Sequence, residues 1–279
     1  MKLAVCNEVF SGWSWQQVCA FAAEQGLAGV EIAPMTFAES VTDVPPARRA
    51  EIRRVARDNG LEVAALHMIL FSPKGLHTNS ADAGKRQKAV DYLKALIEFS
   101  ADIGCPTMIY GSPPTRRLDA GLTYRQARAY FKDSLLKCLD RAAAARVTLC
   151  IEPLPGDCTE LFNSVEAALG FVMDVNHPNL GLMADTKAMS TESRPVADTI
   201  RIFGAELRHV HANDTLGVAP GFGTLDFRPI LQALREVRYD GWLSLEPFHF
   251  RPDAESNVAT SLRYLRAILA DLDAAQGAA

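Results

Sequence analysis

Short apolar runs alternate with longer amphipathic stretches along the whole chain of 279 residues. Eight runs of four to six residues, rich in Val, Ile, Leu and Ala, are typical of buried β-strands. They lie at residues 3–6, 29–33, 62–67, 107–111, 147–152, 180–185, 207–211 and 242–246. Between them, apolar residues recur every three or four positions, as the buried face of a helix requires. We expect helices at 14–25, 46–59, 83–103, 122–145, 164–175, 195–203, 226–237 and 256–272.

Several of the expected helices carry start or stop signals. Asn163, followed three residues later by Glu166, is a candidate N-cap for the fifth helix. Gly26, Gly60 and Gly104 stand where a helix should end, because glycine adopts the left-handed backbone of a helix C-terminus at little cost. These signals support the boundaries that the hydrophobic pattern sets.

The alternation of strand and helix predicts an α/β fold with parallel strands. Eight such units in about 250 residues are what a (β/α)8 barrel, or TIM barrel, requires. An open doubly wound sheet is the alternative, but no G-x-G-x-x-G motif follows the first strand. No stretch rich in Pro, Ser and Gly divides the sequence into parts. We therefore expect one barrel domain over residues 1–279, with 272–279 as a frayed tail.

The composition argues against several classes of protein. Hydrophobic residues make up 48% and charged residues 22% of the chain, as in ordinary globular proteins. A net charge of −4 offers no basic surface for nucleic acid or an anionic membrane. No apolar run reaches the roughly 20 residues of a membrane helix, and the first residues, MKLAVCNEVF, lack a signal-peptide pattern. The six cysteines form no C-x-x-C pair, so we expect free thiols and a cytoplasmic protein.

Polar residues close the last four predicted strands: Glu152, Asp185, His211 and Glu246. In a (β/α)8 barrel the C-terminal ends of the strands meet at one mouth, where active sites lie. Each residue alone could simply cap a loop, but three carboxylates brought together repel one another unless a cation joins them. Two Glu, one Asp and one His suit Mn²⁺, Mg²⁺ or Co²⁺. The sequence therefore predicts a metal site at the mouth.

The segment LRHVHANDT, residues 207–215, holds two histidines two positions apart. Side chains alternate between the faces of a strand, so His209 shares the inward face with His211 and lies one layer below it. We expect His209 to support the metal site by hydrogen bonding instead of binding the metal. Asn213 and Asp214 begin a loop that is expected to carry substrate contacts.

Four further residues are candidates for contacting a substrate. His67 ends the third strand and either points at the mouth or caps the strand. Lys187 either contacts an anionic or hydroxyl group or extends into solvent. Glu31 closes the second strand and either hydrogen-bonds to the substrate or pairs within the mouth. Arg116, after the fourth strand, either binds a phosphate or carboxylate at the rim or stays solvated.

With these residues in place, the sequence resembles the xylose isomerase-like TIM barrels, the sugar phosphate isomerase/epimerase group that includes ketose 3-epimerases and hydroxypyruvate isomerases. The resemblance covers nearly the whole chain. It rests on the four strand-end residues and on the segments GSPPTRR, HVHAND, PGFGTLDF and RYDGWLSLE.

The resemblance implies that Glu152, Asp185, His211 and Glu246 hold one divalent metal, most commonly Mn²⁺, with Mg²⁺, Co²⁺ and Zn²⁺ as alternatives. It also implies that Glu152 and Glu246 act as an acid/base pair on a ketose or related polyhydroxy ketone. Barrels of this group often form homo-oligomers through their outer helices.

The sequence departs from the ketose 3-epimerase pattern around the substrate. That pattern has a histidine three residues after Asp185, where this chain has Ala188, and a glutamate six residues after Glu152, where it has Cys158. The pattern also has an arginine in the loop after the seventh strand, and NDTLGVAPGFG contains none. The metal set thus matches the pattern, while the contacts that orient a ketose do not.

The implied chemistry begins with a divalent ion that acidifies a C–H beside a carbonyl and stabilises an enediolate. One glutamate removes the proton and the other returns it to the opposite face, which gives epimerisation, or carbonyl transfer if the neighbouring carbon receives it.

Three other functions stay open to different degrees. If the enediolate expels a β-hydroxyl, the protein is a dehydratase of a keto-inositol or a dehydroshikimate. A lyase that breaks a carbon–carbon or C-glycosidic bond after the same proton abstraction is a narrower variant. An apurinic endonuclease needs more metal ligands and a basic groove, against which six histidines and the net charge of −4 argue. The third alternative is an accessory subunit that needs a partner protein to complete its pocket.

Overall fold

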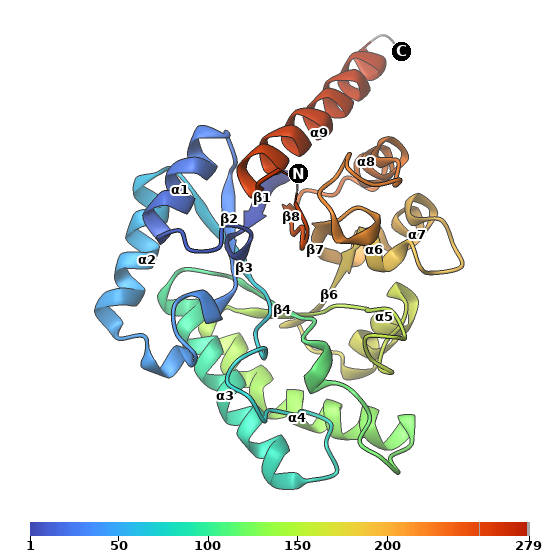
Figure 1. The fold of residues 1–279 in the computed structure, drawn as a ribbon. Coiled ribbons are helices and arrows are strands. Elements are labelled where there is room, and N and C mark those ends of the chain that lie inside the picture. Colours follow the sequence, from blue (N-terminus) through green and yellow to red (C-terminus); the bar gives the residue numbers. More distant parts are fainter. Residues whose placement is uncertain (251, 278–279) are drawn as a thin grey trace.

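Eight parallel strands form a closed barrel at the centre of the computed structural model, which describes residues 1–250 and 252–277 (Figure 1). Each strand pairs with its neighbour in the chain, and β8 pairs with β1 to close the ring. The strands are β1 (Lys2–Cys6), β2 (Gly29–Ile32), β3 (Glu62–Leu66), β4 (Thr107–Tyr110), β5 (Thr148–Ile151), β6 (Leu180–Asp185), β7 (Leu207–Ala212) and β8 (Trp242–Leu245). Their positions confirm the predicted strands and the TIM barrel.

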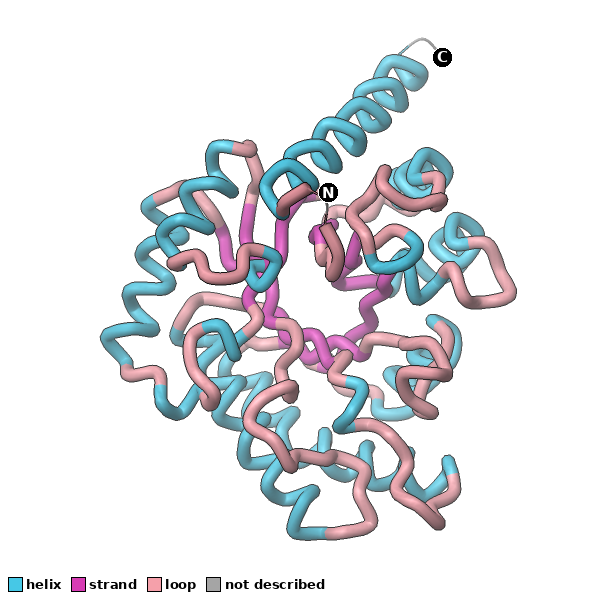
Figure 2. The backbone as a smooth tube through the Cα atoms, viewed as in Figure 1, coloured by secondary structure: helices cyan, strands magenta, loops and turns pink. Residues whose placement is uncertain are grey.

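The helices lie outside the ring of strands and cover its outer face (Figures 1 and 2). They are α1 (Trp15–Glu24), α2 (Pro46–Asp58), α3 (Ala83–Asp102), α4 (Tyr124–Ala145), α5 (Val165–Val175), α6 (Thr186–Met189), α7 (Val196–Phe203), α8 (Phe227–Glu236) and α9 (Ala254–Gly277). The short helix α6 is not predicted by the hydrophobic pattern, because four residues cannot show a helical period. The other eight helices match the predicted ones.

Short 3-10 turns shape the connections between these elements. They are η1 (Asn7–Val9), η2 (Pro34–Thr36), η3 (Val41–Asp43), η4 (Pro113–Thr115), η5 (Gly204–Glu206) and η6 (Thr215–Gly217). Four of them, η1, η2, η4 and η6, follow the C-terminal ends of strands. They therefore lie at the mouth of the barrel, where the candidate site residues are expected.

Two local predictions need correction. The N-cap of α5 is Ser164, whose side chain accepts a hydrogen bond from the backbone N–H of Ala167 at 3.1 Å, and not Asn163. Asn163 instead donates from its side chain to backbone carbonyls of the preceding loop. The expected frayed tail begins too early, because α9 continues to Gly277; residues 278–279 lie outside the described residues.

The interior of the barrel is filled by side chains. Ala65, Ile109, Cys150 and Met183, from four successive strands, form a small buried cluster inside the ring. The main hydrophobic core lies between the strands and the surrounding helices. All six cysteines are free, as expected.

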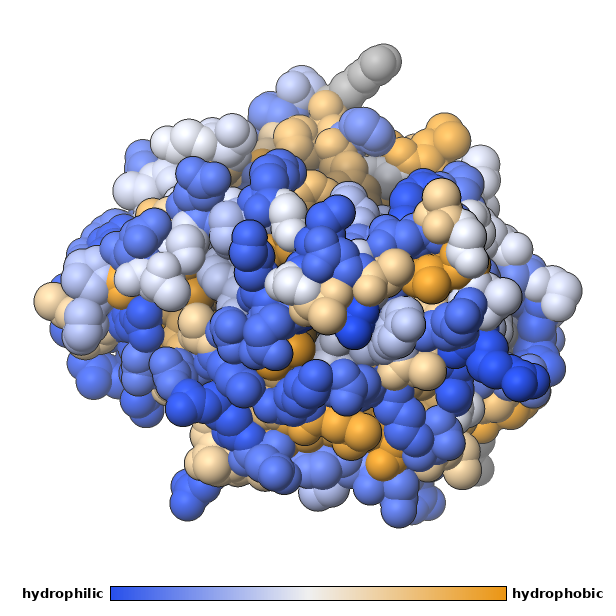
Figure 3. All heavy atoms as spheres, turned by 90° about the horizontal axis from the view of Figure 1, so that it is seen from below, coloured by the Kyte–Doolittle hydropathy of each residue, from blue (hydrophilic) through white to orange (hydrophobic). Residues whose placement is uncertain are grey.

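The surface in view in Figure 3 carries hydrophilic residues over most of its area, with hydrophobic residues in separate groups. None of the helices in the described ranges is long and apolar enough to cross a membrane.

Candidate active site

Glu152, Asp185, His211 and Glu246 converge at the C-terminal mouth of the barrel. Asp185 ends β6, His211 lies in β7, and the two glutamates directly follow β5 and β8. One ligating atom from each side chain lies within 4.8 Å of those of the other three. All four residues are buried. The fold thus gathers three carboxylates and one imidazole at one place, as the strand ends predict.

Glu31 sets the orientation of His211. The carboxylate of Glu31, on β2, accepts hydrogen bonds from Nε2 of His211 at 3.0 Å and from Nε2 of His209 at 2.8 Å. Nδ1 of His211 consequently faces the site, 3.0 Å from Glu246 Oε2 and 3.8 Å from Glu152 Oε1. His209 therefore supports His211 through a shared carboxylate, one layer below, where strand alternation places it.

Hydrogen bonds also fix Glu246 and Asp185. His67 Nδ1 lies 2.9 Å from Glu246 Oε1, and His67 Nε2 lies 2.8 Å from Glu8 Oε2. The side-chain amide of Asn213 donates to Asp185 Oδ2 at 2.6 Å and to Glu246 Oε2 at 3.0 Å. These contacts hold both carboxylates beside His211.

Glu152 differs from the other site carboxylates in its contacts. Within residues 1–250 and 252–277 its carboxylate accepts no hydrogen bond, and its Oε1 lies 3.8 Å from Nδ1 of His211. Gly111, directly after β4, makes room for it, since a Cβ at this position would collide with Glu152 Oε2. Glu152 is therefore the site carboxylate with the fewest restraints on its oxygens.

The surroundings separate the pKa values of the carboxylates. Burial raises the pKa of Glu152 to about 8, against the opposing charge of His211. Burial likewise raises the pKa of Asp185 to about 6. Glu246 is buried too, but the positive charge of nearby His211 and the hydrogen bond with His67 lower its pKa to about 2. Without a cation, burial and the neighbouring charges thus move the pKa values of Glu152 and Glu246 in opposite directions.

A cavity of about 200 Å³ opens beside these side chains. Its lining combines the site residues with apolar walls: His67, Met68, Phe71, Ser112, Pro113, Glu152, Leu154, Pro155, Cys158, Asp185, Lys187, Ala188, Asn213, Glu246 and Phe248. Mostly apolar walls with a few converging polar groups are typical of small-molecule sites.

The predicted substrate contacts divide into two groups. His67 and Lys187 line the cavity, although both ring nitrogens of His67 already face Glu8 and Glu246. Glu31 is 0% exposed and hydrogen-bonds to His209 and His211, which corresponds to the second of its two expected alternatives, pairing within the mouth.

For Arg116, the alternative of a solvated side chain is wrong. Arg116 is 0% exposed, and its guanidinium lies 5.8 Å from the centre of the Tyr110 ring. Its backbone carbonyl accepts hydrogen bonds from Asn79 and Thr159, which hold this segment inward. None of its guanidinium nitrogens has a hydrogen-bond partner in the described part of the chain.

Two side chains that complete the site are not predicted from the sequence. Glu8 lies in η1 and pairs with His67. Asn213 belongs to the loop expected to touch substrate, but its amide bridges Asp185 and Glu246. Both lie two positions beyond an inward-facing strand residue, Cys6 or His211, so alternation continued past the strand end is the signal that finds them.

The donor set fits a divalent metal ion. Nδ1 of His211 is buried without a hydrogen-bond partner among the residues described, and the Glu152 oxygens are similarly uncommitted. Carboxylate oxygens with one imidazole suit Mn²⁺, Mg²⁺ or Co²⁺. A second group, made of Cys6, Glu31, His67 and His211, is equally close, but its Glu31 and His67 are already hydrogen-bonded to other side chains.

The barrel and its strand-end residues define a class of protein. The chain belongs to the xylose isomerase-like TIM barrel family, whose model matches residues 19–268. It is similar to the D-psicose 3-epimerase of Agrobacterium fabrum (strain C58), with 27% identity over 228 residues, 81% of this chain and 76% of that protein.

Two further proteins to which the chain is similar are also 3-epimerases. The L-ribulose-5-phosphate 3-epimerase UlaE of Salmonella heidelberg is 24% identical over 240 residues, 83% of this chain and 81% of that protein. A solved structure of an L-ribulose 3-epimerase has a TM-score of 0.86 at 23% identity, covering 100% of this chain and 98% of the other. At this level of sequence identity, the structural similarity supports the fold alone.

Proposed function

We propose that the protein is a divalent-metal-dependent epimerase or isomerase of a ketose or related polyhydroxy ketone. The observation that carries the proposal is the convergence of Glu152, Asp185, His211 and Glu246 beside a small cavity. The similarity to ketose 3-epimerases supports the same reaction class. We expect Mn²⁺ in the site, with Mg²⁺, Co²⁺ and Zn²⁺ as alternatives.

Glu152 and Glu246 are the proposed acid/base pair. A divalent cation held by the four side chains would polarise the adjacent carbonyl and hydroxyl oxygens of the substrate and acidify the C–H between them. One glutamate removes this proton and the other returns a proton to the opposite face, which inverts the carbon. A proton returned to the neighbouring carbon moves the carbonyl instead. Asp185 and His211 act only as ligands.

The other side chains of the cavity position these groups. His67, with both ring nitrogens engaged, holds Glu246 in place, and Lys187 is the proposed contact for a hydroxyl or anionic group of the substrate. Ala188 and Cys158 line the cavity at two positions where ketose 3-epimerases have polar contacts. We therefore expect the part of the substrate that faces Ala188 and Cys158 to be less polar than the corresponding part of a simple ketose.

The cysteines and the family resemblance bear on the location and assembly of the protein. The six free cysteines support a reducing compartment and hence the cytoplasm. Assembly into a homo-oligomer through the outer helices stays a prediction.

The proposal is tested with purified protein, Mn²⁺ and a panel of ketoses and keto-inositols in D₂O. We expect deuterium to enter the carbon beside the carbonyl while the carbon skeleton is retained. Loss of water to give an absorbing enone would identify a lyase, and absence of exchange with every compound would contradict the proposal.

Matched variants connect the reaction to the site. Glu152→Gln and Glu246→Gln should each lower the exchange rate by at least about 10²-fold, since each removes a proton-transfer group. Glu160→Gln, an exposed carboxylate of the same β5–α5 loop, should retain it. Equal rates in all three variants would exclude the assigned pair.

A further inference from the structure

Arg116 carries a buried charge that no hydrogen bond satisfies. Its side chain is 0% exposed, and Nε and both terminal nitrogens lack a hydrogen-bond partner in the part of the chain that the structure describes. A guanidinium keeps its proton in proteins, so this side chain stays positive. Burying an unpaired charge costs free energy, and a buried polar group without a partner calls for an explanation.

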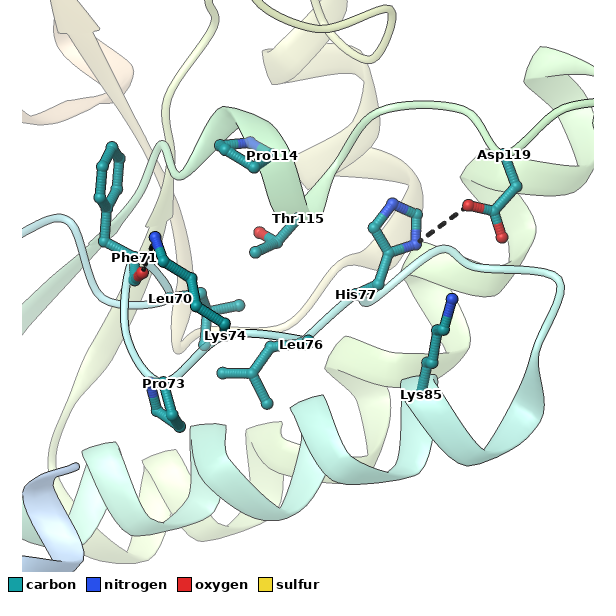
Figure 4. Close-up of a pocket in the computed structure, with 11 residues that line it drawn as sticks. Leu70, Phe71, Pro73, Lys74, Leu76, His77, Lys85, Pro114, Thr115 and Asp119 are labelled. Atoms are coloured by element: carbon teal, nitrogen blue, oxygen red, sulfur yellow. Dashed lines mark hydrogen bonds and ion pairs between the residues drawn. The ribbon is translucent and has the colours of Figure 1, made fainter. Parts of the chain in front are cut away.

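The backbone of Arg116 is held inward. Its carbonyl accepts hydrogen bonds from the side-chain amide of Asn79 at 3.2 Å and from the hydroxyl of Thr159 at 3.1 Å. Pro114 and Thr115, the two residues before it, line a separate cavity of about 250 Å³ between the loops after β3 and β4 (Figure 4). Arg116 lines neither this cavity nor the cavity of the candidate active site. Its charge therefore acts on other side chains from within the protein interior.

Glu152 is the neighbour that can carry the opposite charge. Burial lowers the pKa of the Arg116 guanidinium, and the charges of Tyr110, Glu152 and Cys158 oppose this shift. Burial raises the pKa of Tyr110 to about 12 and also raises the pKa of the Cys158 thiol. Tyr110 and Cys158 are therefore neutral at pH 7. Of these three groups, the carboxylate of Glu152 is the one that answers the charge of Arg116.

The two oxygens of Glu152 face different sides. Oε1 lies 3.8 Å from Nδ1 of His211, on the side of the candidate metal site. Oε2 lies at the end of β4, in the space that Gly111 leaves free because it has no Cβ. Gly111 and Arg116 belong to the same connection between β4 and α4. The carboxylate thus has one oxygen for the metal and one directed toward the segment that carries Arg116.

We propose that Arg116 is a positioning residue that acts through Glu152. Its buried charge holds the carboxylate at the end of β4 and stabilises the negative charge that develops when Glu152 returns a proton to the substrate. In that step the O–H bond of Glu152 breaks, a C–H bond forms on the substrate, and the electron pair of the O–H bond stays on the carboxylate. Arg116 keeps its own proton.

The interior position makes this charge effective. A charge acts more strongly in a protein interior than in solvent, and a fixed charge needs no rearrangement during the reaction. The inference rests on the proposed function and adds one residue to its machinery.

Substitutions at Arg116 separate its charge from its shape. Arg116→Met removes the charge, and kcat at saturating metal should fall by about tenfold or more, while KM changes little because Arg116 does not touch the substrate. Arg116→Lys keeps the charge and should retain most of the activity. Arg117→Met, at the exposed neighbouring arginine, is the matched control and should match the wild type. An unchanged kcat in Arg116→Met, or equal losses in the Met and Lys variants, overturns the inference.

A double-mutant cycle shows whether Arg116 acts through Glu152. In Glu152→Gln the carboxylate is absent, so adding Arg116→Met should cause no further loss of kcat. A further tenfold loss would place the action of Arg116 elsewhere and overturn the inference.

The stability of the metal-free protein gives a readout that needs no turnover. Arg116→Met removes a buried charge without breaking a hydrogen bond of the side chain, so the midpoint of urea unfolding should be at least as high as in the wild type. A lower midpoint would show that the charge serves the fold and would overturn the inference. If no ketose is turned over, the proposed function fails. If ketoses are turned over and Arg116→Met is as active as the wild type, the inference alone fails.

Discussion

Glu31 connects two layers of the barrel through one carboxylate. Burial alone would raise its pKa, but His209 and His211 lower the pKa well below its ordinary value. The ionised carboxylate accepts from Nε2 of both imidazoles. Nδ1 of His211 thereby remains available for the proposed metal.

Glu31→Gln tests this arrangement, because an amide offers one oxygen in place of two. We expect the free energy of unfolding to fall by about 3 kcal/mol, since a buried charged partner is lost. Metal affinity should fall by about 10–100-fold. Urea denaturation and metal titration measure the two effects. Glu62→Gln, which alters an exposed ion pair with Lys2, is the control. If the Glu31 variant matched this control in stability and metal affinity, Glu31 would not be needed to orient His211.

Gly111→Ala tests the packing of Glu152. The added Cβ would collide with Glu152 Oε2, so the carboxylate must move. We expect kcat to fall by about 10²-fold, the usual effect of displacing a reacting group by about 1 Å, with little change in stability. In Gly156→Ala the Cβ meets no atom within 4 Å, and steady-state kinetics should show wild-type activity. Equal activity in both variants would mean that the position of Glu152 is unimportant.

Protonation of Glu152 makes metal binding depend on pH. Its pKa of about 8 in the metal-free site means that the carboxyl is neutral at pH 7, whereas a metal ligand must be ionised. Binding therefore releases a proton, and metal affinity should rise as the pH increases from about 6 to about 8. Calorimetry in two buffers of different ionisation enthalpy measures the released proton. Identical enthalpies in both buffers would contradict the protonated state.

At the scale of elements, the loop after β7 is organised around Asp214. Its carboxylate accepts hydrogen bonds from the backbone N–H groups of Thr215, Gly221, Gly223 and Leu225 at 2.7–3.1 Å. The loop therefore has a fixed shape, although its residues predict only a turn.

Asp214→Ala removes these four contacts at once. We expect a loss of about 3 kcal/mol in stability and faster proteolysis between residues 215 and 225. Asp226→Ala, which removes only a helix cap before α8, should cost about 1 kcal/mol and leave the loop protected. Denaturation and limited proteolysis distinguish the two; matching cleavage rates would show that Asp214 does not fasten the loop.

The elements themselves could be predicted because their signals are local. Short apolar runs place β1–β8, a period of three to four residues places the long helices, and the strand ends identify Asp185 and His211. The conformation of the β4–α4 segment has no such signal. The sequence predicts that Arg116 lies at the surface, but in the structure it is fully buried. Hydrogen bonds from Asn79 and Thr159 to its backbone carbonyl hold the segment inward, and the sequence pattern does not predict these contacts.

At the scale of the whole molecule, closure of the barrel creates contacts that no local pattern contains. β8 pairs with β1, so Glu246 lies near residues of the first strands. Its partner His67 is 179 positions away in the chain, and Glu31 is 180 positions from His211. The convergence of Glu152, Asp185, His211 and Glu246 was therefore predictable from the strand ends, whereas the residues that orient their side chains required the three-dimensional structure.

The metal content of the purified protein tests the central claim most directly. After loading with Mn²⁺ and dialysis, elemental analysis should find about one divalent ion per chain, as a single site with four protein ligands requires. The Glu152→Gln/Glu246→Gln variant should lose this ion while keeping the fold by circular dichroism, and Glu160→Gln should retain it. A wild-type protein without bound metal, or a metal content that the double substitution leaves unchanged, would contradict the site.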